Sequence, residues 1–110
     1  MASLRTRYWD IIQVVSAKYN LDPVLVEAVV VTESAGNTDA FRFEVAYWNR
    51  YMKGRPEWVG KNPRRVSSSY GLMQVMYQVA LEDGLEPASP PEILFIPEIG
   101  LEAGCKRLRK

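Results

Sequence analysis

One carboxylate stands where an apolar segment of this chain ends, and it is the first candidate for chemistry. Glu33 follows a run rich in valine and precedes Ser34. The sequence has no histidine and one cysteine, which excludes Ser-His-Asp and Cys-His nucleophile systems and leaves no His/Cys cluster for a metal. A reactive site must therefore be built from carboxylates, and carboxylates without a metal are best suited to cleaving a glycosidic bond. We expect no metal and no cofactor.

Two effects act in the same direction on Glu33 if residues 24–32 form a helix. Desolvation by apolar neighbours and the negative end of the helix dipole both disfavour the ionised carboxylate, so its pKa should be raised. A carboxyl group that stays protonated near neutral pH can donate its proton to a glycosidic oxygen. The alternative is that Glu33 is simply the first exposed residue after a core helix, and the residue taken alone favours this alternative.

A second motif, Ser69-Tyr70-Gly71-Leu72-Met73-Gln74, lies further along the chain. Gly71 permits close approach of the backbone to a ligand. Leu72 and Met73 suit an apolar wall, and Gln74 offers both a donor and an acceptor to a sugar amide. Taken alone, Gly-Leu-Met-Gln is most often just the start of a helix.

Hydrophobic spacing predicts an all-α chain. The predicted helices cover residues 3–18, 24–32, 40–52, 71–83 and 97–108. Asp22 should cap the second helix, with Pro23 in its first turn, and a left-handed residue should end it near Gly36. Because residues 24–32 are almost all apolar, we expect this helix to be central and buried on every side. Cys105 should be a small core residue of the last helix.

Length and composition limit the class of protein further. At 110 residues, 47% of them hydrophobic, the chain should form a single domain, residues 1–110. A net charge of +1 gives no general case for a nucleic-acid partner, although the basic segment 50–65 suits either an anionic polymer or a solvated loop. No apolar run reaches the length of a membrane span. The polar N-terminus lacks the core of a signal peptide, so we expect another route of release or a leader outside this chain.

Together these motifs resemble the lytic transglycosylase (SLT) family of lysozyme-like domains. The resemblance runs in order through most of the chain, in Ser16-Ala-Lys-Tyr-Asn-Leu-Asp-Pro23, Leu25-Val-Glu-Ala-Val-Val30, Thr32-Glu33-Ser34, Gly71-Leu-Met-Gln-Val-Met76 and Pro91-Glu-Ile-Leu-Phe-Ile-Pro-Glu-Ile99. Arg42-Phe43-Glu44 and the Ser-Ser-Tyr before Gly71 are more similar to phage or prophage members than to the large periplasmic enzymes. The resemblance implies a helical lysozyme-like domain that binds peptidoglycan glycan strands and acts on the bacterial cell wall, in the periplasm or delivered by a phage.

The resemblance also implies the mechanism, with Glu33 as the single catalytic acid and base. It would protonate the oxygen between N-acetylmuramic acid and N-acetylglucosamine and then take a proton from the muramoyl C6 hydroxyl, which attacks C1 and leaves a 1,6-anhydro end. The substrate-binding residues by the same resemblance are Ser34, Ser69, Tyr70, Gly71, Leu72, Met73 and Gln74. Tyr47, Trp48, Tyr51 and Trp58 are stacking candidates, and core packing is the expected role of at least half of them.

Three features depart from the family pattern. Arg65 stands where many members have a serine that contacts the substrate acetamide, and Ser67, Ser68 or Ser69 would have to replace it. Gly100 stands where the last helix usually has Asn. The Ala-Tyr-Asn motif with which the family continues is not in this chain. We therefore expect a truncated domain, a minimal variant, or a domain that completes its cleft by self-association.

Two other functions stay open at this point. One is a non-catalytic remnant of a lysozyme-like domain that binds glycan or has a structural role, which the missing tyrosine motif favours. The other is a goose-type-like lysozyme that hydrolyses the same bond, for which a second carboxylate must activate water. Asp39 and Glu44 are the nearest in sequence, and we expect Glu44 to pair instead with a neighbouring arginine on its own helix.

Overall fold

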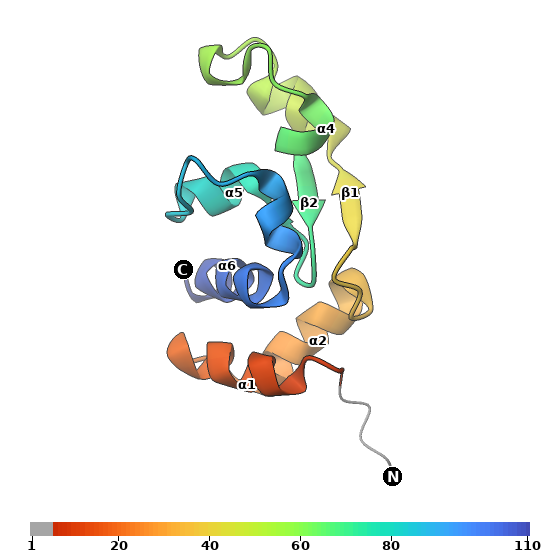
Figure 1. The fold of residues 1–110 in the computed structure, drawn as a ribbon, viewed down its shortest axis with the longest axis vertical. Coiled ribbons are helices and arrows are strands. Elements are labelled where there is room, and N and C mark those ends of the chain that lie inside the picture. Colours follow the sequence, from red (N-terminus) through yellow and green to blue (C-terminus); the bar gives the residue numbers. More distant parts are fainter. Residues whose placement is uncertain (1–5) are drawn as a thin grey trace.

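The computed structural model describes residues 6–110, which form a helical domain with a small sheet between its two ends (Figure 1). The helices are α1 (Trp9–Lys18), α2 (Pro23–Ser34), α3 (Val45–Tyr47), α4 (Pro63–Val66), α5 (Tyr77–Glu82) and α6 (Pro97–Arg109). The other helical turns are the π-helix η1 (Trp48–Met52) and the 3₁₀ turns η2 (Pro56–Trp58) and η3 (Pro91–Phe95). The predicted helical class is confirmed, and the sheet is an addition to it.

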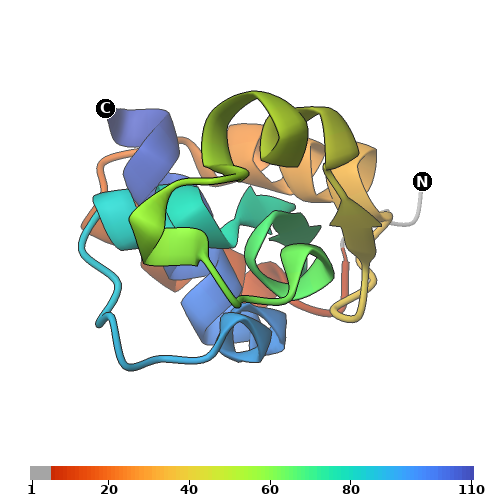
Figure 2. The same cartoon turned by 90° about the horizontal axis from the view of Figure 1, so that it is seen from above.

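An antiparallel sheet of three short strands occupies the middle of the molecule. The strands are β1 (Phe41–Phe43), β2 (Ser68–Tyr70) and β3 (Val75–Met76), in the order β1-β2-β3. Phe41 pairs with Tyr70, and Tyr70 pairs with Val75. Viewed from above, residues 45–66 fold over one end of the sheet (Figure 2). The sheet thus joins this segment to α1 and α2, which lie at the opposite end (Figure 1).

The predicted start and end of α2 are confirmed. The Asp22 carboxylate accepts a hydrogen bond of 2.9 Å from the Val24 N–H, and Pro23 is the first helical residue. At the other end Ala35 is left-handed, with φ of 53°, and Gly36 follows with φ of 79°. The capping signals therefore determine where the helix that carries Glu33 stops.

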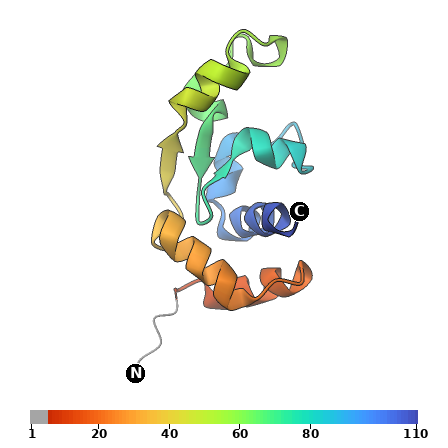
Figure 3. The same cartoon turned by 180° about the vertical axis from the view of Figure 1, so that it is seen from behind.

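The prediction that α2 is buried on every side is wrong. Val26 and Val30 are fully buried, but Val24, Leu25 and Val31 are each at least half exposed. The reason is that α2 lies at the edge of the molecule, where it packs on α1 and on the sheet turn but has no helix on its outer side among the described residues (Figure 3).

The first and last helices follow their predictions closely. α1 begins at Trp9 rather than at residue 3, and residues 3–5 of the predicted helix lie outside the described residues. α6 begins at Pro97 and runs to Arg109, one residue past the predicted end. Cys105 is a fully buried core residue, as predicted, and this burial raises the pKa of its thiol to about 11.

Two predicted helices are wrong because strands occupy part of each. In residues 40–52 the segment from Phe41 to Phe43 is strand β1, and helical structure starts only at Val45. In residues 71–83 the helix starts only at Tyr77. Gly71 and Gln74 have φ of 76° and 50°, which a right-handed helix cannot contain, so residues 71–74 form the turn between β2 and β3 instead.

Tyr70 holds the sheet in the core. Its ring lies edge-to-face with Phe41 at 5.3 Å and with Phe95 at 5.1 Å, measured between ring centroids. Its hydroxyl donates to the Arg65 carbonyl at 2.5 Å, and burial raises its pKa to about 12. Packing on both sides of the ring makes Tyr70 a residue of the core and not of a ligand surface.

Candidate active site

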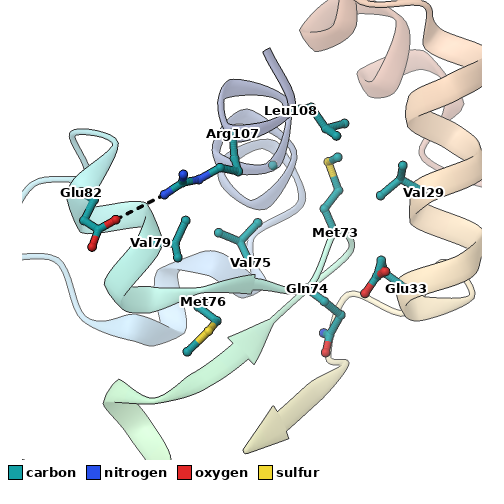
Figure 4. Close-up of a pocket in the computed structure, with 11 residues that line it drawn as sticks. Val29, Glu33, Met73, Gln74, Val75, Met76, Val79, Glu82, Arg107 and Leu108 are labelled. Carbon is teal, nitrogen blue, oxygen red and sulfur yellow. Dashed lines mark hydrogen bonds and ion pairs between the residues drawn. The ribbon is translucent and has the colours of Figure 1, made fainter. Parts of the chain in front are cut away.

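A cavity of about 560 Å³ opens between α2, the β2–β3 turn, α5 and α6 (Figure 4). This volume falls within the roughly 300–1,000 Å³ typical of small-molecule sites. The lining residues are Val29 and Glu33 from α2, Met73 and Gln74 from the turn, Val75 and Met76 from β3, Val79 and Glu82 from α5, and Gly104, Arg107 and Leu108 from α6. The fold therefore brings Glu33 together with two of the predicted substrate-binding residues, Met73 and Gln74.

Glu33 lies in the last turn of α2 at the wall of this cavity. Val29, one turn earlier, and Met73 give this wall an apolar character. In Figure 4 the Glu33 side chain extends from the end of α2 toward the turn that carries Gln74. Its side chain is exposed, so the complete desolvation expected from the valine-rich sequence is not observed. A polymer lying in the cavity would reach this carboxyl group directly.

Ser34 connects the end of α2 to the sheet turn. Its hydroxyl lies 2.8 Å from the carbonyl oxygen of Leu72 and 3.0 Å from that of Val30, and it accepts a bond of 3.2 Å from the Gly36 N–H. A hydroxyl has one proton, so the two carbonyl groups share it. Ser34 is thus a positioning residue that holds α2 and the turn together.

Gln74 forms the corner of the turn in a left-handed conformation. Its backbone N–H donates to the Gly71 carbonyl at 3.1 Å, and its side-chain Nε2 donates to the same carbonyl at 3.0 Å. The side chain is half-buried and lines the cavity. Its Oε1 accepts no hydrogen bond from residues 6–110, which leaves an acceptor for a ligand amide or hydroxyl.

Gly71 was expected to let the backbone approach a ligand closely. This prediction is wrong, because the backbone at Gly71 lies close to another segment of the protein instead. A Cβ at this position would collide with the carbonyl oxygen of Leu94 in η3. Leu72, predicted as part of an apolar wall, is also corrected: it is fully buried in the core. Both residues therefore position the turn and do not line the cavity.

Met73 is largely buried and packs against α6 at Gly104. A Cβ added to Gly104 would lie 2.7 Å from the Met73 Cβ and closer still to its sulfur. The absence of a side chain at Gly104 is what lets the turn approach α6 this closely. Met73 thus contributes to the cavity floor with the small part of its side chain that remains exposed.

The serines before the turn point into the fold, which corrects their assignment to the substrate. Ser69 donates to the Glu44 carboxylate at 2.9 Å, Ser67 donates to the Glu44 carbonyl at 3.1 Å, and Ser68 donates to the Arg64 carbonyl. All three residues are buried. None of them lines the cavity, so none takes the place of the serine that Arg65 replaces.

Neither of the candidate second carboxylates lines this cavity. Glu44 accepts the Ser69 bond and lies 3.9 Å from the guanidinium of Arg42. The predicted pairing with an arginine is observed, but Arg42 belongs to strand β1 and not to a helix shared with Glu44. Asp39 is exposed in the turn before β1. Of the three carboxylates that the sequence singled out, Glu33, Asp39 and Glu44, Glu33 is the one that lines the cavity.

None of the four aromatic stacking candidates lines the cavity of Glu33. Trp48 packs against the core, and neither it nor Tyr47 lines the cavity with Glu33. Tyr47, Tyr51 and Trp58 line a different cavity, of about 400 Å³. Tyr47, Trp48 and Trp58 also pack against the core, in line with the expectation for at least half of these residues.

Sequence reasoning did not find Glu82 and Arg107, which form the polar side of the cavity. Their side chains approach to 3.4 Å, and Arg107 also lies 3.1 Å from the buried carboxylate of Asp83. Lys110 reaches the same carboxylate at 2.8 Å. Gly104, Arg107 and Leu108 are spaced so that they share one face of α6, and this spacing was the sequence signal that could have grouped them. Only the tertiary structure shows that this face lines the cavity.

Two further observations concern residues 6–110 only. No three His, Cys, Asp or Glu side chains in this part of the chain gather in a way that could hold a metal ion. No helix within it combines the length and the apolar character that crossing a membrane requires.

A helical domain in which a helix-end carboxylate borders a cavity beside a short antiparallel hairpin is of the lysozyme-like class. Residues 10–110 match the family described as "Transglycosylase SLT domain", and the chain belongs to that family. This is a family of lytic transglycosylases, with peptidoglycan as the substrate class. The resemblance seen in the sequence is thereby confirmed. No curated protein and no solved structure matches the chain.

Proposed function

We propose that this domain cleaves the β-1,4 bond between N-acetylmuramic acid and N-acetylglucosamine in peptidoglycan, with Glu33 as the single general acid and base. One observation carries the proposal. Two carboxylates line the cavity, and Glu82 is engaged by Gln78 and Arg107. Glu33 makes no hydrogen bond or ion pair with the described residues, and it lies beside Gln74, whose Oε1 is available to a ligand.

The proposed reaction needs no second carboxylate. Glu33 in its acid form gives its proton to the glycosidic oxygen as the bond from that oxygen to muramoyl C1 breaks. The resulting Glu33 carboxylate then takes the proton of the muramoyl C6 hydroxyl, whose oxygen forms the new bond to C1. The products are a free N-acetylglucosamine 4-hydroxyl and a 1,6-anhydromuramoyl end, and no water is consumed. A lone, unpaired carboxylate suits this sequence of steps.

Hydrolysis of the same bond is less well supported. An inverting enzyme needs a second carboxylate roughly 6.5–9.5 Å from the first, with room for a water between them. Glu82 is the second carboxylate of the cavity, and Gln78 and Arg107 engage it. Glu44 is held by Ser69 and Arg42, and Asp39 does not line the cavity. The proposal therefore favours the anhydro product over a hydrated reducing end.

The place of action and the assembly are also proposals. We propose action at the bacterial cell wall, in the periplasm or after delivery by a phage particle, because peptidoglycan is found there. Self-association to complete the cleft is supported by the exposed apolar side chains of Val24, Leu25 and Val31 on α2. Sedimentation of the chain across a range of concentrations tests it, and a monomer at every concentration contradicts it.

Mass spectrometry of the soluble fragments released from purified peptidoglycan tests the reaction. We expect 1,6-anhydro ends with the parent chain and a loss of roughly 10²- to 10⁴-fold in their rate of release with Glu33→Gln, which keeps the shape but cannot exchange the proton. Glu98→Gln is the matched control, because Glu98 is an exposed carboxylate in the first turn of α6 that lines neither cavity. Circular dichroism should show all three chains equally folded.

Each other outcome points to a different function. Release by Glu33→Gln at the parent's rate would overturn the role of Glu33. Hydrated muramoyl ends would identify a lysozyme. Co-sedimentation with intact glycan, without soluble fragments, would identify the non-catalytic glycan-binding form.

A further inference from the structure

A second cavity lies in the segment that folds over the end of the sheet. Residues 45–58, here called the aromatic arm, consist of α3, η1, η2 and the turns between them. The arm and α5 enclose about 400 Å³, lined by Tyr47, Tyr51, Met52, Arg55, Glu57, Trp58, Gln78 and Glu82. Nothing in the proposed cleavage step uses this cavity.

The lining of the second cavity suits a sugar ring. The rings of Tyr47 and Tyr51 lie 4.8 Å apart between centroids at 46°, and Tyr51 is 47% exposed. Trp58 adds a third, half-buried ring. The guanidinium of Arg50 lies over the Tyr51 ring, 5.4 Å from its centroid. A pyranose presents apolar C–H faces to such rings, and its hydroxyl and acetamide groups need planar polar partners.

Polar partners of this kind are present in the cavity. Gln78, Arg55 and Glu57 line it with an amide, a guanidinium and a carboxylate. Arg55 and Glu57 are exposed and make no side-chain hydrogen bond or ion pair with residues 6–110. Their donors and acceptors are therefore available to a ligand without breaking a bond of the fold.

The two cavities adjoin across a chain of hydrogen bonds. Tyr47 donates from its hydroxyl to Gln78 Oε1 at 2.7 Å, and Gln78 Nε2 donates to the Glu82 carboxylate. Glu82 lines both cavities and pairs with Arg107 in the first of them. A linear polymer in the cavity of Glu33 would meet the arm cavity next along this side of the molecule.

We propose that the arm cavity is a distal subsite for further sugar residues of the same β-1,4-linked glycan strand, and that packing on Tyr51 makes binding depend on strand length. The proposal rests on the proposed function in one respect, which is that a glycan occupies the first cavity. A stem peptide is the competing occupant, because Arg55 and Glu57 could pair with its charged groups. The three aromatic rings favour the sugar.

Calorimetric titration with peptide-free β-1,4 oligomers of N-acetylglucosamine tests this, using a dimer and a hexamer as probes. Tyr51→Ala should weaken binding of the hexamer by about 3- to 10-fold, the usual contribution of one ring contact, and should leave binding of the dimer unchanged. Tyr51→Phe is the matched variant, because the Tyr51 hydroxyl makes no hydrogen bond within the described residues, and it should bind like the parent. Thermal melts should show both variants folded.

Two results would overturn the subsite. One is equal hexamer affinity for the parent and Tyr51→Ala. The other is a loss confined to peptidoglycan fragments that carry stem peptides, which would make the cavity a peptide site.

The proposed function can fail separately. A chain whose hexamer binding depends on Tyr51 but which releases no anhydro ends would keep the subsite and lose the transglycosylase. A chain that releases anhydro ends, but whose hexamer binding does not depend on Tyr51, would support the transglycosylase and overturn the subsite.

Discussion

The Ser34 hydroxyl and the Leu72 carbonyl oxygen lie 2.8 Å apart, and this contact connects the two motifs that carry the candidate site. Ser34 directly follows Glu33, and Leu72 directly precedes Met73. The hydrogen bond between Ser34 and Leu72 therefore helps to set the position of the proposed acid, Glu33, relative to the β2–β3 turn that carries Met73. The bond matters because catalysis by one carboxylate depends on its placement.

Ser34→Ala should lower activity more than it lowers stability. Removal of the hydroxyl leaves the Leu72 carbonyl without this donor and should reduce the free energy of unfolding by about 1 kcal/mol. Misplacement of Glu33 should reduce kcat by roughly 10- to 100-fold with a smaller change in KM. Urea unfolding and the rate of anhydro-end release measure the two effects. Thr32→Val, which replaces an exposed hydroxyl of the same helix by a methyl group of similar shape and helix propensity, should change neither. A fully active Ser34→Ala would contradict the positioning role.

Two substitutions at Gln74 separate its side chain from its backbone conformation. Both Gln74→Ala and Gln74→Gly remove the amide and should weaken glycan binding equally, by roughly 3- to 10-fold. At φ of 50°, alanine keeps the strain of a left-handed residue whereas glycine relieves it, so the glycine variant should be more stable by about 1 kcal/mol. Calorimetric titration and urea unfolding supply the comparison. If the glycine variant binds like the parent, the amide is not a ligand contact.

Gly104→Ala should destabilise the domain because its methyl group would overlap Met73. We expect a loss of about 1–3 kcal/mol in the free energy of unfolding, as for other overpacked sites. In a Met73→Ala background the same substitution should cost less, since the space is then free. A double-mutant cycle in urea should give a coupling of at least about 0.5 kcal/mol. Additive effects would mean that the contact between α6 and the turn relaxes without cost.

Glu102 should make the free energy of unfolding depend on pH in the acidic range. Burial raises the pKa of this carboxyl, but hydrogen bonds from Lys18 and Tyr19, both at 2.5 Å, outweigh burial and leave the pKa below its usual 4.5. The folded state thus binds this proton more weakly than the unfolded state. The stabilisation is present above the unfolded pKa and is lost as the pH falls through the lowered folded pKa.

Urea unfolding of the parent and of Glu102→Gln measures this dependence. At about pH 7 the parent should be more stable, by less than about 1 kcal/mol because Lys18 is exposed, and the difference should shrink as the pH falls below 4.5 and through the lowered folded pKa. Asp39→Asn, at the exposed carboxylate of the turn before β1, should match the parent throughout this pH range. A difference between the parent and Glu102→Gln that persists unchanged in acid would show that packing, and not the charge, is responsible.

Features that depend on neighbouring residues could be predicted from the sequence. Asp22 and Pro23 start α2, and Ala35 with Gly36 ends it, because these signals act through hydrogen bonds and backbone angles within one turn of the chain. Pro97 starts α6 for the same reason. The position of Glu33 at the end of a helix was therefore predictable, and so was the helical class.

The tertiary structure decided which residues pair and which are exposed. Strand β2 forms by pairing with residues 41–43 far away in the sequence, so the segment from Gly71 became a turn rather than a helix. The same pairing buried Tyr70 and turned Ser69 toward Glu44, whereas Gln74 stayed at the cavity. Burial depends on what packs against a residue, and no local pattern contains that information. Non-local packing also brought Arg107 of α6 to the cavity wall opposite α2.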